Sequence, residues 1–373
     1  MSIAAVRAAL DGETVLRVGM LGDETGDVPE GTAVVIATSG STGIPKHVML
    51  SAEALRASAE ATATRIGSGR WLLALPSGYV AGLQVLVRSV LAGTEPAVLE
   101  DGFSARAFAE ATLPMLRPVS GSGGELERLY TSLVPAQIAT LLDAADDPTV
   151  LAALQAYTAI LVGGQALPEP VRERAAELGA RLVRTYGSSE TSGGCVYDGT
   201  PLETVAARTV DGELWIAGPM IADGYLGDPE LTERTFVRDE HGIRWYRTGD
   251  LGIVEDGVVR VQGRADNVIV SGGINISLDR VERIVRDVPG LAAAVVVGVD
   301  DERWGEASVI VVPRGETLRR SESDQLESAR EAVAAELGKP ARPARLILVD
   351  EIPVLASGKP DRESIRRMAA ELR

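Results

Sequence analysis

Residues 38–46 read Thr-Ser-Gly-Ser-Thr-Gly-Ile-Pro-Lys and bring hydroxyl, glycine and cationic groups together in one short stretch. Residues 32–38 form an apolar run typical of a buried strand, so the stretch lies at a strand end. Glycines let the backbone turn sharply, and free N–H groups, hydroxyls and an ammonium together suit a polyphosphate. The spacing of Gly40, Gly43 and Lys46 does not fit a Walker A loop. The sequence therefore predicts a phosphate loop of another type, against the alternative of a polar surface loop.

Three further side chains have chemistry that a nucleotide could use. Tyr186 follows a strand and precedes a glycine, where its ring could stack on a flat base, although a core tyrosine would look the same. Glu190 is an acid among small polar residues, and Asp250 follows a threonine and a glycine. A carboxylate can accept hydrogen bonds from two hydroxyls. The alternative for both acids is a surface charge.

Length, charge and cysteine content exclude several classes of protein. The chain has 373 residues, which favours two domains. Its formal charge is −16, from 37 Lys and Arg against 53 Asp and Glu, so neither nucleic acid nor an anionic membrane is an expected partner. Cys195 is the single cysteine, so no disulfide framework or cysteine zinc site is expected. The 2 histidines, His47 and His241, have no evident catalytic partner, which disfavours a Ser/His/Asp hydrolase.

No signal-peptide pattern opens the chain, and no apolar run approaches the ~20 residues that span a bilayer. A cytoplasmic protein is expected.

Strand and helix patterns alternate through the first half of the chain, which predicts a layered α/β domain with a mostly parallel sheet. The expected strands are residues 32–38, 71–76, 96–100, 158–164 and 181–187. The expected helices are one capped by Ser51 and ending near Ile66, and those at residues 80–93 and 171–179.

The pattern changes after about residue 205. Residues 212–218 and 244–263 resemble short antiparallel strands. A compact α+β unit follows, with helices expected at 278–288 and 321–338 and strands at 292–300, 307–313 and 344–350. We expect a boundary at 265–267, between a domain of residues 1–264 and one of residues 265–373.

Five segments, in order, resemble the adenylate-forming superfamily of acyl- and aryl-CoA ligases, peptide-synthetase adenylation domains and luciferases. They are residues 38–46, VGGQALP at 162–168, TYGSSET at 185–191, YRTGDL at 246–251 with QGRADNVIVSGG at 262–273, and SGKPDR at 357–362. The resemblance implies a large N-terminal α/β domain with layered sheets, joined by a hinge to a small C-terminal α+β domain. Only 37 residues precede the phosphate loop, fewer than in most relatives, so the fold is expected to be N-terminally shortened.

The resemblance also implies a role for each motif residue. Tyr186 is expected beside adenine, Asp250 on the ribose hydroxyls, and Arg264 on the ribose or a phosphate. Glu190 is expected to hold the Mg²⁺ that accompanies ATP, consistent with hard oxygen ligation. The residues expected to bind ATP or AMP are Thr38, Ser39, Gly40, Ser41, Thr42, Gly43, Lys46, Gly163, Gly164, Thr185, Tyr186, Gly187, Ser188, Asp250, Arg264 and Lys359.

Lys359 is the expected catalytic cation, acting with Lys46 and Glu190. In the superfamily, the matching lysine touches the acid and the α-phosphate while charge grows on the phosphate oxygens. It lies far along the chain from the other motifs, so a mobile domain must deliver it, and Asp266 matches the hinge. Gly272 and Gly273 are expected to line the coenzyme A channel, against the alternative of an ordinary β-turn.

The acid is predicted by a narrower resemblance, to the short ligases that activate o-succinylbenzoate for menaquinone biosynthesis. Residues 129–139 and 184–199 carry it. Tyr79 stands where many acyl-CoA ligases have histidine, and could act as an aromatic gate. Cys195 is expected as a small apolar lining residue. The remaining pocket candidates are Thr131, Ser132, Gln137, Ser192, Gly193 and Gly194, with Arg88 as a further clamp for the second carboxylate or else a surface charge.

Two alternatives stay open at this point. One keeps the mechanism but activates a fatty, benzoic or amino acid, as another ligase or a stand-alone adenylation enzyme. The other is a non-catalytic relative that senses ATP or AMP. The expected partners are a carboxylic acid, ATP with Mg²⁺, and coenzyme A; a homodimer stays open.

Overall fold

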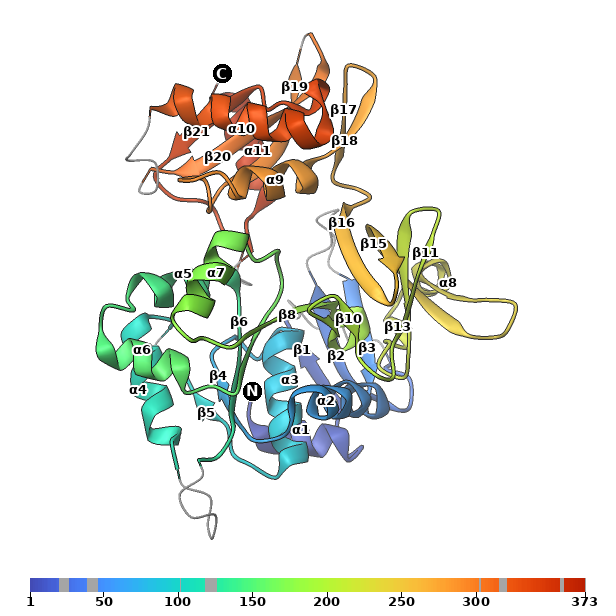
Figure 1. The fold of residues 1–373 in the computed structure, drawn as a ribbon. Coiled ribbons are helices and arrows are strands. Elements are labelled where there is room, and N and C mark those ends of the chain that lie inside the picture. Colours follow the sequence, from blue (N-terminus) through green and yellow to red (C-terminus); the bar gives the residue numbers. More distant parts are fainter. Residues whose placement is uncertain are drawn as a thin grey trace.

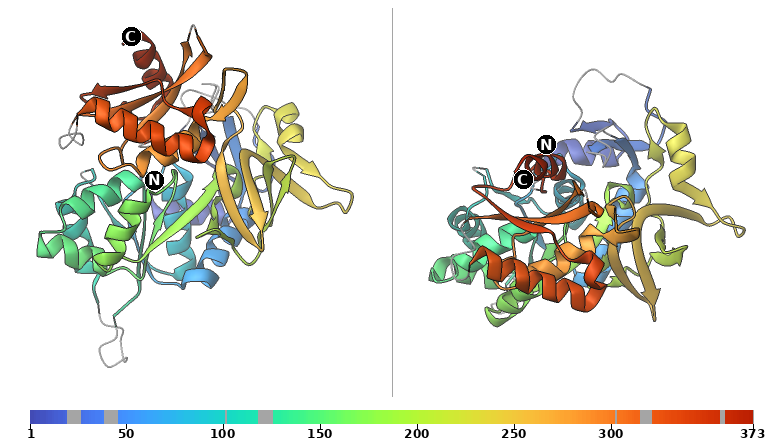
Figure 2. Two further views of the ribbon diagram at one scale, coloured as in Figure 1. Left: turned by 45° about the horizontal axis from the view of Figure 1, so that its top comes forward. Right: turned by 90° about the horizontal axis from the view of Figure 1, so that it is seen from above.

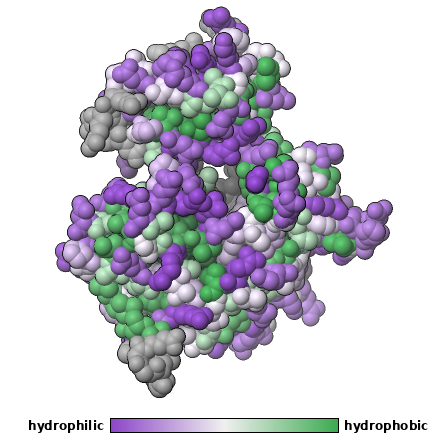
Figure 3. Space-filling model, in the orientation of Figure 1, coloured by the Kyte–Doolittle hydropathy of each residue, from purple (hydrophilic) through white to green (hydrophobic). Residues whose placement is uncertain are grey.

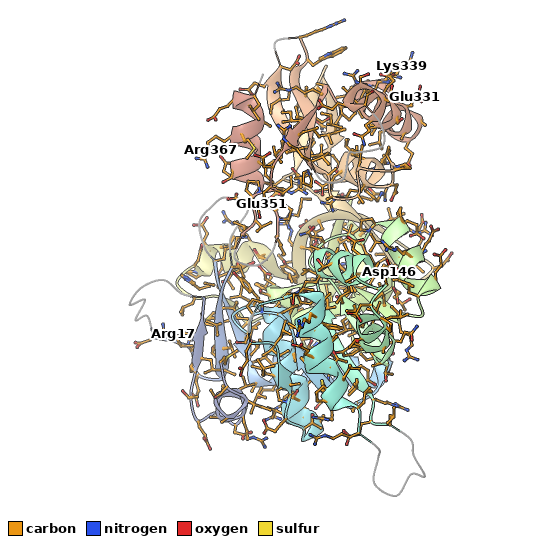
Figure 4. All side chains as sticks on the ribbon, turned by 90° about the vertical axis from the view of Figure 1, so that its left-hand side faces the viewer. Arg17, Asp146, Glu331, Lys339, Glu351 and Arg367 are labelled. Atoms are coloured by element: carbon orange, nitrogen blue, oxygen red, sulfur yellow. The ribbon has the colours of Figure 1, made fainter. Side chains whose placement is uncertain are left out.

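A computed structural model of all 373 residues describes residues 1–19, 27–38, 46–100, 102–117, 126–301, 303–314, 321–355 and 359–372. Within these ranges, no helix is long and apolar enough to cross a membrane. Charged side chains such as Asp146, Glu331, Lys339 and Arg367 project outward from the fold (Figure 4).

A four-stranded sheet, in the order β1-β2-β3-β13, forms one side of the large N-terminal part. Its strands are β1 (Leu16–Val18), β2 (Thr32–Thr38), β3 (Lys46–Ser51) and β13 (Gly224–Tyr225). β2 and β3 pair antiparallel, with Thr38 opposite Lys46. The predicted strand at 32–38 is present, but it belongs to this hairpin and not to the parallel sheet. β3 was not predicted, although Val48 and Leu50 are buried in alternation with the half-buried His47 and Met49.

The second sheet has seven strands, in the order β10-β9-β8-β7-β6-β4-β5. They are β4 (Arg70–Leu73), β5 (Ala97–Val98), β6 (Leu129–Leu133), β7 (Ala159–Val162), β8 (Leu182–Ser188), β9 (Gly193–Tyr197) and β10 (Thr200–Pro201). The neighbours from β5 to β8 run parallel, whereas β9 and β10 are antiparallel. The carboxyl ends of β6, β7 and β8 therefore lie at one edge, the usual place for a ligand in such a sheet.

Helices cover both faces of the seven-stranded sheet. α1 (Ile3–Leu10), α2 (Ala52–Ile66) and α3 (Val80–Ala92) share one core with the four-stranded sheet, as Val6, Leu55 and Leu83 show. Helices on the other face form a second core: α4 (Ala105–Thr112), α5 (Pro135–Asp143), α6 (Pro148–Gln155) and α7 (Glu169–Glu177). Neighbouring residues of β4 point to opposite cores, Trp71 to the first and Leu72 to the second. Ser51 caps α2 as expected, since its Oγ accepts from the N–H of Ala54 at 3.2 Å.

A third sheet, in the order β11-β12-β15-β14 with β16 beside β15, follows in the chain. It comprises β11 (Ala206–Val210), β12 (Glu213–Ala217), β14 (Phe236–Arg238), β15 (Arg244–Glu255) and β16 (Val258–Arg264), with α8 (Pro229–Thr235) between β13 and β14. Asp256 and Gly257, at φ 50° and 77°, form the tight turn between β15 and β16. β16 ends at the expected hinge.

The C-terminal unit is a five-stranded sheet in the order β18-β17-β20-β19, with β21 beside β20. Its strands are β17 (Val268–Ser271), β18 (Ile274–Ser277), β19 (Val295–Asp301), β20 (Gly305–Pro313) and β21 (Arg345–Val349). α9 (Leu278–Arg286) and α10 (Glu322–Leu337) pack on one face and α11 (Arg362–Glu371) on the other. Three of these elements were not predicted. β17 and β18 were missed because their residues were interpreted as a motif loop, and α11 was missed as well.

This C-terminal unit lies above the large part, over α5, α7 and the end of β16 (Figure 1). The views in Figure 2 agree with this arrangement and show α10 along the outer side of the unit. In the space-filling view, a hollow opens between the upper and lower parts, and hydrophilic residues cover much of its rim (Figure 3). The chain between β21 and α11 extends from the upper unit toward α7 (Figure 1).

Candidate active site

The ends of the β2–β3 hairpin hold the two outer residues of the predicted phosphate loop. Thr38 Oγ1 donates to the backbone oxygen of Lys46 at 3.3 Å, which closes the hairpin below the loop. Ser39, Gly40, Ser41, Thr42 and Gly43 lie outside the described residues. The two strands thus bring Lys46, at the far end of the loop, back beside Thr38.

Glu190 is only 8% exposed and lies in a short 3-10 turn, Ser189–Thr191, directly after β8. Its Oε1 accepts from the hydroxyl of Tyr225 at 3.0 Å. The ammonium of Lys46 lies 5.5 Å from the centre of the Tyr225 ring. One tyrosine therefore connects the phosphate-loop lysine with the expected metal ligand.

Tyr186, Asp250 and Arg264 form a second connected group. The Tyr186 hydroxyl donates to Asp250 Oδ2 at 2.5 Å, and Arg264 Nη1 donates to Asp250 Oδ1 at 3.2 Å. Burial raises the pKa of Asp250, whereas the Tyr186 hydroxyl and the Arg264 charge lower it. Burial, then the charge of Asp250, raises the pKa of Tyr186, which keeps the hydroxyl a donor.

Lys359 enters this site from the C-terminal unit. A Cβ built on Gly164, which follows β7 and has φ 83°, would lie 3.6 Å from Lys359 Cε. Burial lowers the pKa of Lys359, while the negative charges of Glu190 and Asp250 raise it. The side chain still reaches solvent, because Lys359 is an exposed residue, and its ammonium lies within the electrostatic influence of the two acids of the site.

The other predicted nucleotide contacts lie at the same sheet edge. Gly163 follows β7 and lies so close to β8 that a Cβ there would be 2.5 Å from Thr185 Oγ1. Thr185 and Gly187 belong to β8, where a Cβ on Gly187 would lie 2.1 Å from the backbone oxygen of Gly193. Ser188 ends β8, and its N–H donates to Thr191 Oγ1 at 2.8 Å. Glycines here permit strand contacts that any side chain would block.

The predicted pocket residues lie in or next to α3, β6, α5 and β9. Tyr79 precedes α3, and Gly193 and Gly194 begin β9. Three of the polar candidates are already bonded to backbone: Thr131 to the oxygen of Leu72, Gln137 to that of Ala74, and Ser192 to that of Met220. Ser132 is buried in β6. Thr131, Gln137 and Ser192 thus have structural bonds, and their role as a clamp stays a prediction.

Arg88 is not the surface charge that its helix position allowed. It is 7% exposed, and its guanidinium lies 4.9 Å from the ring centre of Trp71. Its Nη2 donates to Thr62 Oγ1 at 3.3 Å and to the Tyr197 hydroxyl at 3.5 Å. No ion pair is found for Arg88 within the described part of the chain, and its Nε has no partner there. Burial lowers its pKa.

Gln84 stands one helical turn before Arg88, on the same side of α3. Its Nε2 donates to the oxygen of Leu55 at 3.3 Å, but its buried Oε1 has no partner in the described structure. A Cβ on Gly193 would lie 3.2 Å from Gln84 Cγ. Gln84 therefore has an unsatisfied polar atom close to the first glycine of β9, whereas Arg88 lies beside Tyr197, at the end of that strand.

Cys195, on the same strand, is fully buried. Burial raises the pKa of its thiol to about 12, which suits a lining residue and not a nucleophile.

The expected hinge residue lies between the two parts, whereas the expected coenzyme A residues belong to the C-terminal unit. Asp266 follows β16 and forms an ion pair with Arg264 at 3.0 Å. Gly272 and Gly273, at φ 58° and 80°, form the turn between β17 and β18. A Cβ on Gly272 would lie 3.0 Å from the ring of Trp304, which is 45% exposed.

Sequence reasoning missed Tyr225, Gln84 and the burial of Arg88. Tyr225 comes from β13, which joins the sheet of the phosphate hairpin, so nothing near residues 38–46 or 190 marks it. Its position between Gly224 and Gly227 was the available signal. Gln84 and Arg88 have helical spacing in an otherwise apolar segment, a pattern typical of inward-facing polar groups.

A large α/β part that carries the predicted nucleotide residues, followed by a small unit that carries Lys359, has the architecture of an adenylate-forming enzyme. The chain belongs to the AMP-binding enzyme family: the family's main domain matches residues 7–226, and the AMP-binding enzyme C-terminal domain matches residues 280–359.

Relatives within the family are similar along most of the chain. A probable 2-succinylbenzoate–CoA ligase of Mycobacterium tuberculosis is 41% identical, over 92% of this chain and 86% of that protein. The 2-succinylbenzoate–CoA ligase of Geobacillus kaustophilus is 30% identical, over 92% and 71%. The solved o-succinylbenzoate CoA synthetase of Bacillus subtilis, in complex with its acyl-adenylate intermediate, is 27% identical with a TM-score of 0.74, over 90% of this chain and 69% of that one.

We expect Tyr225→Phe to weaken ATP turnover while leaving the fold intact. The variant keeps the ring beside Phe236 and Lys46 but removes the hydrogen bond to Glu190. Losing a bond to a charged group costs about 1.5–3 kcal/mol, so kcat/KM for ATP should fall about tenfold or more. Pyrophosphate release at varied ATP measures this.

Tyr157→Phe is the matched control, because its buried hydroxyl bonds Thr112 in a core outside the site. If the two variants lose kcat/KM for ATP equally, the Tyr225 hydroxyl contributes to packing alone.

Proposed function

We propose that the protein is an AMP-forming acid–thiol ligase that joins o-succinylbenzoate to coenzyme A in menaquinone biosynthesis. The observation that carries the chemistry is the position of Lys359 beside Gly164, at the end of β7, where the charges of Glu190 and Asp250 act on it. The observation that carries the acid is 41% identity to a 2-succinylbenzoate–CoA ligase over 92% of the chain.

In the first half-reaction, a carboxylate oxygen of the acid attacks the α-phosphorus of ATP, and pyrophosphate leaves. Two anions must meet, and negative charge increases on the phosphate oxygens as they do. A preorganised cation stabilises such a transition state. Lys359 is that cation, Lys46 and the phosphate loop hold the β- and γ-phosphates, and Asp250 holds the ribose.

In the second half-reaction, the thiol sulfur of coenzyme A attacks the acyl carbonyl. The bond to the phosphate oxygen breaks, AMP leaves, and the thiol proton is released. Lys359 has no part in this step. Rotation of residues 265–373 about Asp266 withdraws it and brings Gly272 and Gly273 to the thiol channel.

Mg²⁺ would accompany ATP, and Glu190 would hold it. In the described part of the chain, no cluster of three or more acidic, histidine or cysteine residues could hold a metal alone. One buried carboxylate beside the phosphate loop fits an ion whose other ligands are phosphate oxygens and water. The bound ion would neutralise phosphate charge.

Arg88 would recognise the second carboxylate of the substrate. A buried guanidinium without an acidic partner is costly unless an anion joins it. The Nε of Arg88 has no partner in the described structure and could donate to such an anion. The enzyme would act in the cytoplasm, without nucleic acid, and as a homodimer if it assembles.

The deciding experiment is pyrophosphate release with ATP, Mg²⁺ and a small acid panel led by o-succinylbenzoate, with and without coenzyme A. Selective thioester formation from o-succinylbenzoate supports the proposal. Turnover of another acid keeps the mechanism but discards the pathway, whereas ATP binding without any pyrophosphate release would favour a sensor.

We expect Lys359→Ala to reduce acyl-adenylate formation by about a hundredfold or more, because the transition state loses its cation. Thioester formation from supplied acyl adenylate should be spared. Because burial lowers the pKa of Lys359 and only its ammonium form is active, adenylation should decline as pH rises, before the ordinary lysine range is reached. Single-turnover assays of each half-reaction measure both effects, and equal losses in the two halves would contradict this division.

We expect Arg88→Met to reduce activation of o-succinylbenzoate about a hundredfold, because the variant cannot form an ion pair with the second carboxylate of the substrate. The methionine keeps an apolar side chain beside Trp71. The variant should activate benzoate, which lacks the second carboxylate, as well as the native enzyme does. Arg88→Lys, which keeps the charge, is the control, and thermal melting checks the fold. A uniform loss for both acids would remove Arg88 from the clamp.

A further inference from the structure

Asp279, in the first turn of α9, is bonded to both sides of the expected hinge. Its Oδ2 accepts from the backbone N–H of Arg264 at 2.7 Å, and its Oδ1 accepts from Asn267 Nδ2 at 2.7 Å. If the chain turns at Asp266, Arg264 stays with the large part and Asn267 moves with the small unit. One carboxylate therefore spans the point of rotation.

The surrounding backbone is packed tightly against this carboxylate. Gly263 has φ 141°, and a Cβ there would lie 2.7 Å from Asp279 Cβ and 2.8 Å from Ser277 Oγ. The N–H of Leu278 donates to the oxygen of Asn267 at 3.0 Å. The end of β16 and the start of α9 are thus held in one relative position.

Arg264 extends this connection into the nucleotide site. Its backbone N–H bonds Asp279, while its guanidinium bonds Asp250 at 3.2 Å and the oxygen of Thr248 at 3.0 Å. Movement of Asp279 away from Arg264 would therefore disturb the residue that bonds Asp250, the expected ribose acceptor.

A second path leads from Asp279 to Lys359. Arg362 begins α11, and its Nη2 lies 3.6 Å from Asp279 Oδ1 and 2.8 Å from Glu282 Oε2. The loop before α11 is closed by the N–H of Leu355 bonding the oxygen of Lys359 at 2.8 Å. The ammonium of Lys359 and the carboxylate of Asp279 therefore belong to one connected frame.

We propose that Asp279, with Arg264 and Asn267, forms a hinge latch that holds Lys359 in the acid-activating position. Asp279 is a positioning residue and touches no substrate. The latch must break at Arg264 before the small unit rotates, whereas its bond to Asn267 moves with that unit. This inference rests on the proposed two-step function, and it predicts that the latch favours the first half-reaction over the second.

The test is Asp279→Ala, with each half-reaction measured separately. Removing a bond to a charged group should lower acyl-adenylate formation about tenfold or more. Thioester formation from supplied acyl adenylate should be unchanged or faster, because the unit no longer has to break the latch. Gly263→Ala, which displaces Asp279 from the other side, should give the same split.

Trypsin supplies a readout that needs no acid substrate. The peptide bond after Arg264 lies within the latch, so trypsin should cut the Asp279→Ala variant there several times faster than it cuts the native protein. Mass spectrometry of fragments that end at Arg264 measures this rate. Asp279→Asn should restore most of the native behaviour, since its amide oxygen can accept from Arg264 and its amide nitrogen can donate to a flipped Asn267.

Val333→Ala is the matched control for destabilisation, because Val333 is fully buried in the core of the C-terminal unit and distant in sequence from the hinge. It should lower the melting temperature without changing the ratio of the two half-reactions or the cleavage at Arg264. Equal losses in both half-reactions of Asp279→Ala, or native cleavage at Arg264, would overturn the latch.

Failure of the proposed function would look different. If o-succinylbenzoate is not the acid, the half-reaction ratio can be measured with whichever acid the panel identifies. If no acid is activated, the trypsin experiment still tests the latch.

Discussion

The position of Lys359, whose side chain lies beside Gly164, is the constraint on which the rest of the site depends. The negative charges of Glu190 and Asp250 favour its ammonium form. Because Lys359 belongs to a separate unit, its position depends on how that unit is seated. Tyr225 is bonded to Glu190, and Tyr186 and Arg264 are bonded to Asp250, which fixes these two acids.

Sequence reasoning identified the layered α/β class, most elements of the parallel sheet and the order of the C-terminal unit. Those predictions rest on local patterns: apolar runs for β7 and β8, a serine cap for α2, and helical spacing in α9 and α10. The β2–β3 hairpin was missed because a glycine-rich loop after a strand commonly leads into a helix, and the short β3 before Ser51 gives only a weak alternation.

The motif residues of the candidate site were identified by resemblance. The structure links Lys46 to Glu190 through Tyr225, joins Tyr186 and Arg264 to Asp250 by hydrogen bonds, and places Lys359 beside Gly164. Tyr225 could not be identified, because its contact with Glu190 depends on pairing between β3 and β13, far apart in sequence. The burial of Arg88 had a signal in the apolar segment around it, but a single arginine on a helix is more often a surface charge. Asp279 carries no motif, and only the fold places it beside both flanks of the hinge.

The acidic character of the chain has a kinetic consequence. ATP, coenzyme A and a dicarboxylic acid are all anions, and a protein with a formal charge of −16 repels each of them at long range. Local cations such as Lys46, Arg88, Arg264 and Lys359 attract them only within the ~8 Å over which charges act at physiological ionic strength. Added salt therefore screens the repulsion that governs approach more than the attraction that governs final docking. For this enzyme, moderate salt should speed substrate capture, the reverse of the behaviour of enzymes that steer anions with a positive surface.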